Sequence, residues 1–485
     1  MASPSPHCPL SIAIRREASD PTNPRPLDRK AKSHCVPGGS SAIRGLPLSG
    51  PRCHYLVLMS VLPRHLLPDN SDIALNGRLS IGGCDLIDLG AEHGTPVFVY
   101  DEDHLRARCR EAVAAFPDGA AYATKAFLCG AMARLAVEEG MSLDVSTGGE
   151  IHVALAAGVS PDLLVFHGNN KSHHELKLAI DTGVGRIVID SMIEINRIEE
   201  LVKNGSPPPT VLIRVNPGVE AHTHEFLRTG VADSKFGISI EGGRALEAFR
   251  RVENSGAMEL IGVHAHVGSQ VFEVESFNKA VVAIGEFIRP LEIEELSVGG
   301  GLGVPYVEGE EAPSISEWGL SVRSAAADAG IDARIVAEPG RSIVAQAAVT
   351  VYTVGTIKDV PGVRTYVSVD GGMSDNPRPV LYGSGYEVFA PKATDVERDW
   401  EIRVVGKHCE SGDVLVWNGV VPSDIETGDI LATPVTGAYG HTMGSNYNMV
   451  LRPPVVFAKD GDARLVIRRE TYQDLLMRDQ TISCK

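Results

Sequence analysis

Residues 119–125 read Gly-Ala-Ala-Tyr-Ala-Thr-Lys, a short apolar run that ends in a lysine. Similar runs recur along the chain, separated by segments long enough for a helix: 142–145, 163–167, 186–190, 210–215, 260–266, 295–300 and 334–338. The intervening segments, such as 151–159 and 192–202, carry apolar residues at helical spacing. Strands that alternate with helices in this way predict parallel pairing, and eight of them predict a (β/α)₈ TIM barrel.

The sequence on either side of the barrel differs from it. After about residue 345, β-branched segments are separated by Gly, Pro and Asp, which predicts a mostly β C-terminal domain. Residues 69–100 also resemble strands, and we expect an N-terminal segment to complete the same sheet. The expected parts are an N-terminal extension (1–58), a segment joining the β domain (59–95), the barrel (96–345) and the β domain (346–485). The stretch 217–258 exceeds one helix and predicts an extra loop.

The N-terminal extension, residues 1–58, is rich in Pro, Ser and Gly and has no persistent helical or strand period. Such a composition predicts a disordered tail. Two alternatives remain: translation that starts at Met59, or a transit peptide.

The net charge and the cysteine content indicate which partners the protein can bind and in which cell compartment it works. The 485 residues carry a net charge of −17, which repels nucleic acid and anionic membrane surfaces. The eight cysteines show no CxxC spacing, which favours reduced thiols and a cytoplasmic location. The apolar run 55–62 is too short to span a bilayer.

Polar residues follow the predicted strands at the end where barrels carry their chemistry. A lysine among buried neighbours, such as Lys125, can lose its proton and form an imine with an aldehyde cofactor. Gly299, Gly300 and Gly301 would let backbone N–H groups approach a phosphate. Each signal also has a structural explanation, because a lysine can end a strand in solvent, glycines can form a tight turn, and Glu338 can pair with Arg341.

His264 and His266 suggest a competing function, a metal-dependent barrel hydrolase. Such a site needs further ligands, and the candidates His222 and His224 fall in the long loop after the fifth strand. The other strand ends offer a lysine and glycines instead. This ligand count argues against a metal.

Taken together and in this order, several motifs resemble the alanine-racemase-like, fold type III pyridoxal-phosphate enzymes: Tyr122-Ala-Thr-Lys125, His266-Val-Gly-Ser269, Gly299-Gly-Gly301 and Glu338-Pro-Gly-Arg341. The C-terminal motifs are similar to those of the diaminopimelate decarboxylases: Asp370-Gly-Gly-Met-Ser-Asp-Asn-Pro-Arg378, Cys409-Glu410-Ser-Gly-Asp413, Gly437-Ala-Tyr439 and Ser445-Asn-Tyr-Asn448. The resemblance covers about residues 62–455, and the motifs are highly specific as a set.

The resemblance implies that the chain binds pyridoxal 5′-phosphate. Lys125 would hold the cofactor as a Schiff base, His266 would stack on its ring, and Glu338 would pair with the pyridine nitrogen. The phosphate would lie among Ser269, Gly299, Gly300, Gly301, Pro339, Gly340 and Arg341. Tyr439 would contact both the cofactor and the substrate.

The reaction implied is decarboxylation of meso-2,6-diaminopimelate to L-lysine and CO₂, the last step of lysine biosynthesis. The substrate carboxylates would be bound by Arg341, Arg378 and Tyr382. The distal ammonium group would be bound by Glu410. Cys409 would donate the proton, because a thiol is a suitable acid at neutral pH. In this family the Cys-Glu loop reaches the neighbouring subunit, which implies a homodimer with shared active sites.

Two other functions stay open at this point. One is another fold type III decarboxylase, acting on carboxynorspermidine or on a pathway-specific diamino acid. The second is a barrel that binds the cofactor without catalysis. The pair Arg378 and Glu410 argues against the first, and the intact C-terminal motifs argue against the second.

Overall fold

The computed structural model describes residues 61–218 and 234–482. The predicted tail, the alternative start at Met59 and the candidate ligands His222 and His224 lie outside the described residues. Within the described part, no helix has the length and apolarity needed to cross a membrane.

All eight predicted barrel strands form, and they pair in parallel in the order β13-β12-β11-β9-β8-β7-β6-β5. The ring closes where the chain after β13 meets β5, since Ala121 N donates to Ala337 O at 2.9 Å and Ala123 N to Pro339 O at 3.0 Å. The predicted barrel is therefore confirmed. Its strands are β5 (Ala121–Ala123), β6 (Ser142–Val145), β7 (Leu164–Phe166), β8 (Arg186–Ile189), β9 (Thr210–Asn216), β11 (Glu259–His264), β12 (Glu295–Ser297) and β13 (Arg334–Val336), with β10 (Ile238–Ser239) added beside β9.

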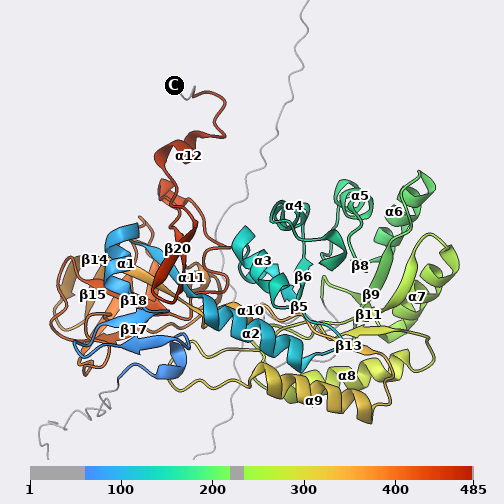
Figure 1. Ribbon diagram of the computed structural model, residues 1–485, viewed down its shortest axis with the longest axis horizontal. Helices are drawn as coiled ribbons and strands as arrows, with labels where there is room; N and C mark the ends of the chain where they lie inside the picture. Colours follow the sequence, from blue (N-terminus) through green and yellow to red (C-terminus); the bar gives the residue numbers. More distant parts are fainter. Residues whose placement is uncertain (1–60, 219–233, 483–485) are drawn as a thin grey trace, which may run out of the picture. The chain divides into compact units, whose positions relative to one another are not determined.

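Helices follow the barrel strands and cover the outside of the ring (Figure 1). Side-chain caps fix where several of them begin: Ser172 and Glu175 form a capping box at α5, and Ser314 and Glu317 form another at α9. The strand β13 is followed only by a short helix, α10, which contacts α2. The helices are α2 (Glu102–Ala115), α3 (Gly130–Glu138), α4 (Gly148–Ala156), α5 (His173–Thr182), α6 (Met192–Lys203), α7 (Arg244–Ser255), α8 (Val274–Ile288), α9 (Ile315–Asp328) and α10 (Arg341–Val344), with short 3₁₀ turns η2 (Thr124–Ala126), η3 (Pro161–Leu163) and η5 (Glu241–Gly243).

The barrel has a small apolar core of its own, distinct from the main core. It consists of Ala121, Val165, Val188 and Leu212, one residue from each of four strands, with Ile261 packed against them. Side chains from several strands that meet in this way are typical of a filled barrel interior. The barrel is thus a solid support for residues at the strand ends.

The second domain is built on an eight-stranded sheet that includes a strand from near the N-terminus. Strand β4 (Val97–Asp101) pairs antiparallel with β14 and parallel with β19, which confirms that N-terminal residues complete the C-terminal sheet. In Figure 1 the blue N-terminal strands lie among the orange and red strands of this domain. The other strands are β14 (Ala348–Val360), β15 (Arg364–Val369), β16 (Trp400–Val405), β17 (Val414–Val421), β18 (Ile430–Pro434), β19 (Val455–Lys459) and β20 (Asp462–Ile467).

β4 lies just beyond the segment 59–95 that we expected in this role, so the exact domain boundaries stay a prediction. Within 59–95, a separate three-stranded sheet forms from β1 (Ser71–Ile73), β2 (Leu79–Ile81) and β3 (Cys84–Asp85), next to η1 (Arg64–Leu66) and α1 (Leu86–His93). The remaining short elements are α11 (Arg378–Tyr382), η6 (Tyr447–Met449) and α12 (Tyr472–Leu476).

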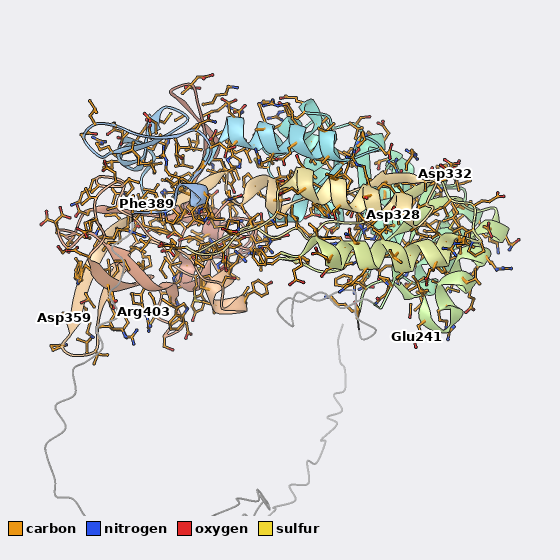
Figure 2. All side chains as sticks on the ribbon, turned by 90° about the horizontal axis from the view of Figure 1, so that it is seen from below. Glu241, Asp328, Asp332, Asp359, Phe389 and Arg403 are labelled. Carbon is orange, nitrogen blue, oxygen red and sulfur yellow. The ribbon has the colours of Figure 1, made fainter. Side chains whose placement is uncertain are left out.

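The β domain has a buried interior and a charged surface. Phe389 is 1% exposed and bridges to Ala432 of β18. Arg403 lies at the surface, where its guanidinium stacks on Trp417 at 4.5 Å from the ring centroid. Figure 2 shows Phe389 among other side chains of this domain, whereas Asp359 and Arg403 lie at its edge.

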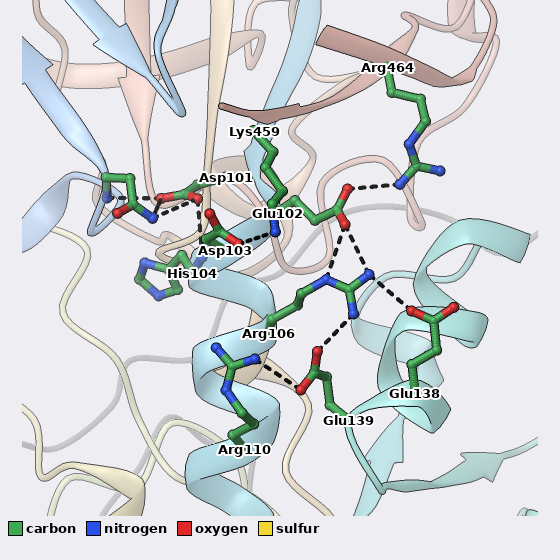
Figure 3. Close-up of polar contacts among 11 residues, drawn as sticks. Asp101, Glu102, Asp103, His104, Arg106, Arg110, Glu138, Glu139, Lys459 and Arg464 are labelled. Atoms are coloured by element: carbon green, nitrogen blue, oxygen red, sulfur yellow. Dashed lines mark hydrogen bonds and ion pairs between the residues drawn. The ribbon is translucent and has the colours of Figure 1, made fainter. Parts of the chain in front are cut away.

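An ionic cluster connects α2 of the barrel to the β domain (Figure 3). Arg106 of α2 binds three carboxylates: Glu102 at 3.0 Å, Glu138 at 2.9 Å and Glu139 at 2.7 Å. Glu102 also pairs with Arg464 of β20 at 2.8 Å, so the cluster joins elements of both domains. The adjacent Asp103 pairs with Lys459 of β19 at 2.7 Å.

Candidate active site

A cavity of about 320 Å³ lies at the carboxyl ends of the barrel strands. Most of the predicted site residues line it: Lys125, His266, Ser269, Gly300, Gly301, Glu338, Gly340, Arg341, Arg378, Tyr382 and Tyr439. Four further residues complete the lining: Ala123, Asp144, Phe236 and Met443. A larger cavity of about 480 Å³ beside the start of α9 is lined by none of the predicted site residues. The cavity at the strand ends is therefore the candidate site.

Lys125 lies in η2, directly after β5, and lines this cavity. Desolvation by the surrounding protein lowers the pKa of its amine, but the charge of Asp144 on β6 raises it, and the net pKa lies above its ordinary value. The amine is thus protonated near neutral pH. Loss of this proton, expected from buried neighbours, stays a prediction, and the carboxylate of Asp144 opposes it.

Glu338 follows β13 and contacts three groups from the ends of other barrel strands. Its Oε2 lies 2.9 Å from His264 Nε2, and its Oε1 lies 3.2 Å from His167 Nε2 and accepts a 2.8 Å hydrogen bond from Ser297 Oγ. Burial alone would raise the pKa of Glu338, but the two histidines lower it, and the net pKa lies well below its ordinary value. Burial lowers the pKa of His264, so this imidazole is neutral and its Nε2–H can donate to the carboxylate. Glu338 is therefore an ionised acceptor at the cavity wall.

The glycines after β12 allow three strand ends to pack closely. A Cβ on Gly300 would lie 2.2 Å from Glu338 O, and one on Gly301 would lie 2.1 Å from Gly268 O. Gly299 and Gly301 also have positive φ angles of +68° and +116°, which favour glycine. A side chain at these positions would push the loops apart and distort the cavity wall.

His266 and the glycine loop are joined directly. His266 Nδ1 accepts a hydrogen bond from Gly300 N at 3.2 Å. Burial lowers the pKa of His266 well below its ordinary value, and the nearby charge of Lys125 lowers it further. The imidazole is therefore neutral, which suits stacking on a flat ring.

Two buried arginines face the cavity from different domains. Arg341, at the start of α10, donates to Tyr306 Oη at 2.7 Å and to Ser269 Oγ at 2.8 Å. Arg378, at the start of α11 in the β domain, donates to Tyr386 Oη at 2.6 Å. Arg341 Nε is buried with no hydrogen-bond partner among the described residues. This arrangement can receive an anion.

Tyr439 reaches the cavity from the β domain in a strained conformation. Its φ angle is +60°, a region that non-glycine residues rarely adopt. Its backbone N–H donates to Ala126 O at 2.9 Å, next to Lys125, and its ring lies 4.8 Å from the Arg341 guanidinium. Strain of this kind at a cavity wall is typical of functional sites.

Four predicted site residues do not line the cavity. Gly299 and Pro339 contribute backbone carbonyls that hold the strand ends together, to Glu338 N at 2.7 Å and Ala123 N at 3.0 Å. Cys409 and Glu410 are exposed. Their loop is held by Asp413, which accepts from His408 Nδ1 at 2.8 Å, and Cys409 N donates to Asn448 Oδ1 at 3.0 Å. The roles of all four stay predictions.

The metal alternative needs His264 and His266 to act together, but their side chains have separate contacts. His264 faces Glu338, whereas His266 accepts from Gly300, so the two side chains contact different groups. Among the described residues, the cluster that resembles a ligand set is His167, His264 and Glu338, with atoms within 4.8 Å of one another. In that cluster, Glu338 is already held by hydrogen bonds from protein groups.

Several site residues were not predicted from the sequence, and only some of them had a signal in it. Asp144 lies in the last half of β6 and His167 directly follows β7, so both stand near predicted strand ends, the same signal that indicated Lys125. Tyr306 and Tyr386 lie in loops without strand or helix pattern, and only their contacts with arginines reveal them. Phe236 and Met443 are apolar loop residues for which the sequence gives no signal.

Comparison with known proteins agrees with this site. Residues 102–345 match the model of the pyridoxal-dependent decarboxylase, pyridoxal binding domain, family. A diaminopimelate decarboxylase from Mycobacterium tuberculosis is 45% identical over 436 residues, covering 86% of this chain and 98% of the relative. One from Bacillus subtilis is 43% identical, covering 83% and 95%. The chain belongs to the diaminopimelate decarboxylases.

Solved structures of the family share the fold. A diaminopimelate decarboxylase from M. jannaschii in complex with L-lysine has a TM-score of 0.79 and 30% identity, covering 85% of this chain and 98% of that one. The Helicobacter pylori structure, also complexed with L-lysine, has a TM-score of 0.76 and 30% identity, covering 81% and 99%. The family is one of pyridoxal-dependent decarboxylases, and the cavity offers a lysine, an ionised carboxylate and an arginine with a free N–H, a set that fits this cofactor.

Proposed function

We propose that this chain decarboxylates meso-2,6-diaminopimelate to L-lysine and CO₂ with pyridoxal 5′-phosphate as cofactor. One observation carries the proposal: Lys125 and Glu338 face the same cavity as Arg341 and Arg378. The relatives named diaminopimelate decarboxylase, at 43–45% identity over most of the chain, support the substrate.

Each end of the cofactor has a partner in the cavity. Lys125 would hold its aldehyde carbon, and Glu338, ionised by its histidines, would keep the ring nitrogen protonated. The phosphate would lie near Gly300, Gly301 and Arg341, together with the predicted Ser269, Gly299, Pro339 and Gly340. When bound, pyridoxal phosphate supplies a sink for the electron pair released as CO₂ leaves.

The substrate is an amino acid at both ends, so its second end must be recognised. Arg341 and Arg378 present planar forks suited to a carboxylate, and Tyr382 adds a hydroxyl donor. Glu410 would bind the distal ammonium group. Ornithine and arginine lack the second carboxylate and would leave a buried guanidinium unpaired, so we expect them to be poor substrates.

Cys409 would donate the proton that replaces CO₂ on the α-carbon. Because Cys409 and Glu410 are exposed and do not line the cavity of their own chain, we infer that they act in the cavity of a partner subunit. The active unit would then be a homodimer, which we place in the cytoplasm.

The first test examines cofactor binding and substrate turnover in one experiment. The protein is purified with pyridoxal phosphate, its visible spectrum is recorded, and meso-diaminopimelate is added while lysine is assayed. Lysine together with a visible band that is lost in Lys125→Ala supports both cofactor and substrate. A band without lysine would overturn the substrate, and no band in either protein would overturn the whole proposal.

The shared site can be tested by mixing inactive subunits. Lys125→Ala and Cys409→Ala homodimers should each be nearly inactive. A mixed dimer would contain one site with both Lys125 and Cys409 intact, so mixing after reversible dissociation should restore part of the activity. Absence of any recovery, in mixtures shown by mass spectrometry to contain hybrids, would rule out sharing.

A further inference from the structure

Arg341 and Arg378 are buried without a counter-charge. Their residues are 6% and 3% exposed, respectively. Among the described residues, neither guanidinium has a carboxylate within ion-pair distance, whereas the buried Lys171 pairs with Glu194 at 2.5 Å. Burial of an unpaired charge is costly unless hydrogen bonds hold it.

Two tyrosines supply those hydrogen bonds. Tyr306 Oη accepts from Arg341 Nη1 at 2.7 Å, and Tyr386 Oη accepts from Arg378 Nη1 at 2.6 Å. The Tyr306 ring also lies under the Arg378 guanidinium, 4.1 Å from its centroid, so Tyr306 contacts both arginines. The two phenol rings meet edge to face with centroids 5.2 Å apart, which makes the four side chains one packed unit.

Neither tyrosine lines the cavity, whereas both arginines do. The tyrosines therefore contact the arginines from outside the cavity. Tyr306 comes from the loop after β12 of the barrel, and Tyr386 comes from the β domain after α11.

We propose that Tyr306 and Tyr386 are positioning residues, which orient the Arg341 and Arg378 forks toward a carboxylate of the substrate. This inference rests on the proposed function. A phenol fixes one N–H of a guanidinium without neutralising its charge, so the other N–H groups stay available for an anion. A carboxylate in the same place would compete with the substrate. Burial raises the pKa of Tyr386 to about 12, so its phenol is neutral at working pH.

The test compares Tyr386→Phe with wild type, because this change removes one hydroxyl and keeps the ring. Two quantities are measured: KM and kcat for meso-diaminopimelate, and the Kd of pimelate, a seven-carbon dicarboxylate without amines, by isothermal titration. Tyr352→Phe is the matched control, because Tyr352 is a buried tyrosine of β14 outside the cavity.

We expect KM and the pimelate Kd of Tyr386→Phe each to rise about tenfold, as for loss of a hydrogen bond to a charged group, with kcat and the cofactor band nearly unchanged. Tyr306→Phe should raise the same two constants, since it frees Arg341. The control should match wild type. Unchanged KM and pimelate Kd in Tyr386→Phe, or a fall in kcat alone, would overturn the inference.

The two proposals fail in different ways. If wild type makes no lysine, the proposed function fails, and the pimelate Kd values still decide whether the tyrosines position the arginines. If wild type makes lysine but both tyrosine variants bind pimelate and substrate as wild type does, only the positioning role fails.

Discussion

His264 Nε2 lies 2.9 Å from Glu338 Oε2, and both side chains are buried. The other ring nitrogen of His264, Nδ1, has no hydrogen-bond partner in the described part of the chain. His264 is thus oriented by Glu338 and by the edge of the His167 ring, whose centroid lies 4.8 Å away. Because His264 is neutral and Glu338 is ionised, the histidine acts as a donor that holds the carboxylate in place.

The change His264→Phe keeps a ring of similar volume but removes this donor. We expect the Kd of pyridoxal phosphate, measured by titration of the cofactor-free protein, to rise about tenfold, because a charge-assisted hydrogen bond contributes roughly 1.5–3 kcal/mol. The exposed His152 of α4 provides the control His152→Phe. Equal Kd values for the two variants would show that His264 does not support Glu338.

The low pKa of Glu338 predicts that cofactor affinity does not change with pH near neutrality. Its folded-state pKa lies well below its ordinary value, so its contribution is present above the unfolded pKa of about 4.3 and is lost only as the pH falls through the folded pKa. Between pH 6 and 9, cofactor affinity should therefore show no titration of this group. The same titration in Glu338→Gln gives the affinity without a carboxylate, and a step in wild type that is absent from Glu338→Gln would contradict the assignment.

Asp144 raises the pKa of Lys125, so Asp144→Asn should lower it. An amine attacks an aldehyde in its neutral form, and removal of a nearby opposite charge lowers the pKa of an amine. The pH profile for formation of the visible cofactor band should then move toward lower pH. Asp328→Asn, at the exposed end of α9, is the control, and an unmoved profile in Asp144→Asn would exclude this coupling.

Cys409→Ala tests the proton donor. We expect a normal cofactor band and loss of most lysine formation, because a general acid typically contributes 10²–10⁴-fold, roughly, to a rate. Cys84→Ala, a change of another free thiol, should leave both readouts unchanged. Turnover at the wild-type level in Cys409→Ala would rule out its role as the acid.

The barrel could be predicted from the sequence because strand-like runs recur at regular intervals. Most of the residues that line the cavity could be predicted because they directly follow those runs. The runs 142–145 and 334–338 form strands where expected, and Lys125 and Glu338 meet at one end of the ring. What could not be predicted depends on tertiary contacts. The segments 430–434 and 455–459 become β18 and β19 without being expected, because pairing with β14 and β4 decides their structure.

The residues that hold the two arginines in place also could not be predicted from the sequence. Tyr306 and Tyr386 are 80 residues apart in number, and nothing in their local sequence indicates that each accepts from a different arginine. The effect of Asp144 on the pKa of Lys125 could not be predicted for a similar reason, since Asp144 approaches this lysine only in the folded chain. Local sequence patterns predict where each strand ends. The pKa values of the residues there depend on which strand ends become neighbours in the folded chain.

Asp375 predicts a pH-dependent stability. Burial raises the pKa of this carboxyl to about 7, above its unfolded value, so its protonated form stabilises the fold fully below pH 4, and this contribution is lost as the pH rises to about 7. Asp375→Asn mimics the protonated form and should become more stable than wild type above pH 7, by up to about 4 kcal/mol for a shift of this size. Urea unfolding midpoints at pH 5 and pH 8 measure this, with the exposed Asp332→Asn as control. A difference between Asp375→Asn and wild type that does not grow with pH would contradict the raised pKa.

Arg106→Ala tests the ionic cluster between the domains. The change leaves Glu102, Glu138 and Glu139 without the cation that they share. Their negative charges then repel one another, although Glu102 keeps Arg464 as a partner. We expect a loss of roughly 1–2 kcal/mol in unfolding free energy, the sum of a few partly buried ion pairs, and a smaller loss in 1 M salt, where charges are screened. Arg110→Ala is the matched control, because Arg110 is 58% exposed and binds only one of these carboxylates, Glu139. Equal losses in both variants, or a loss that does not depend on salt, would show that Arg106 acts by packing and that the cluster does not stabilise the contact between α2 and the β domain.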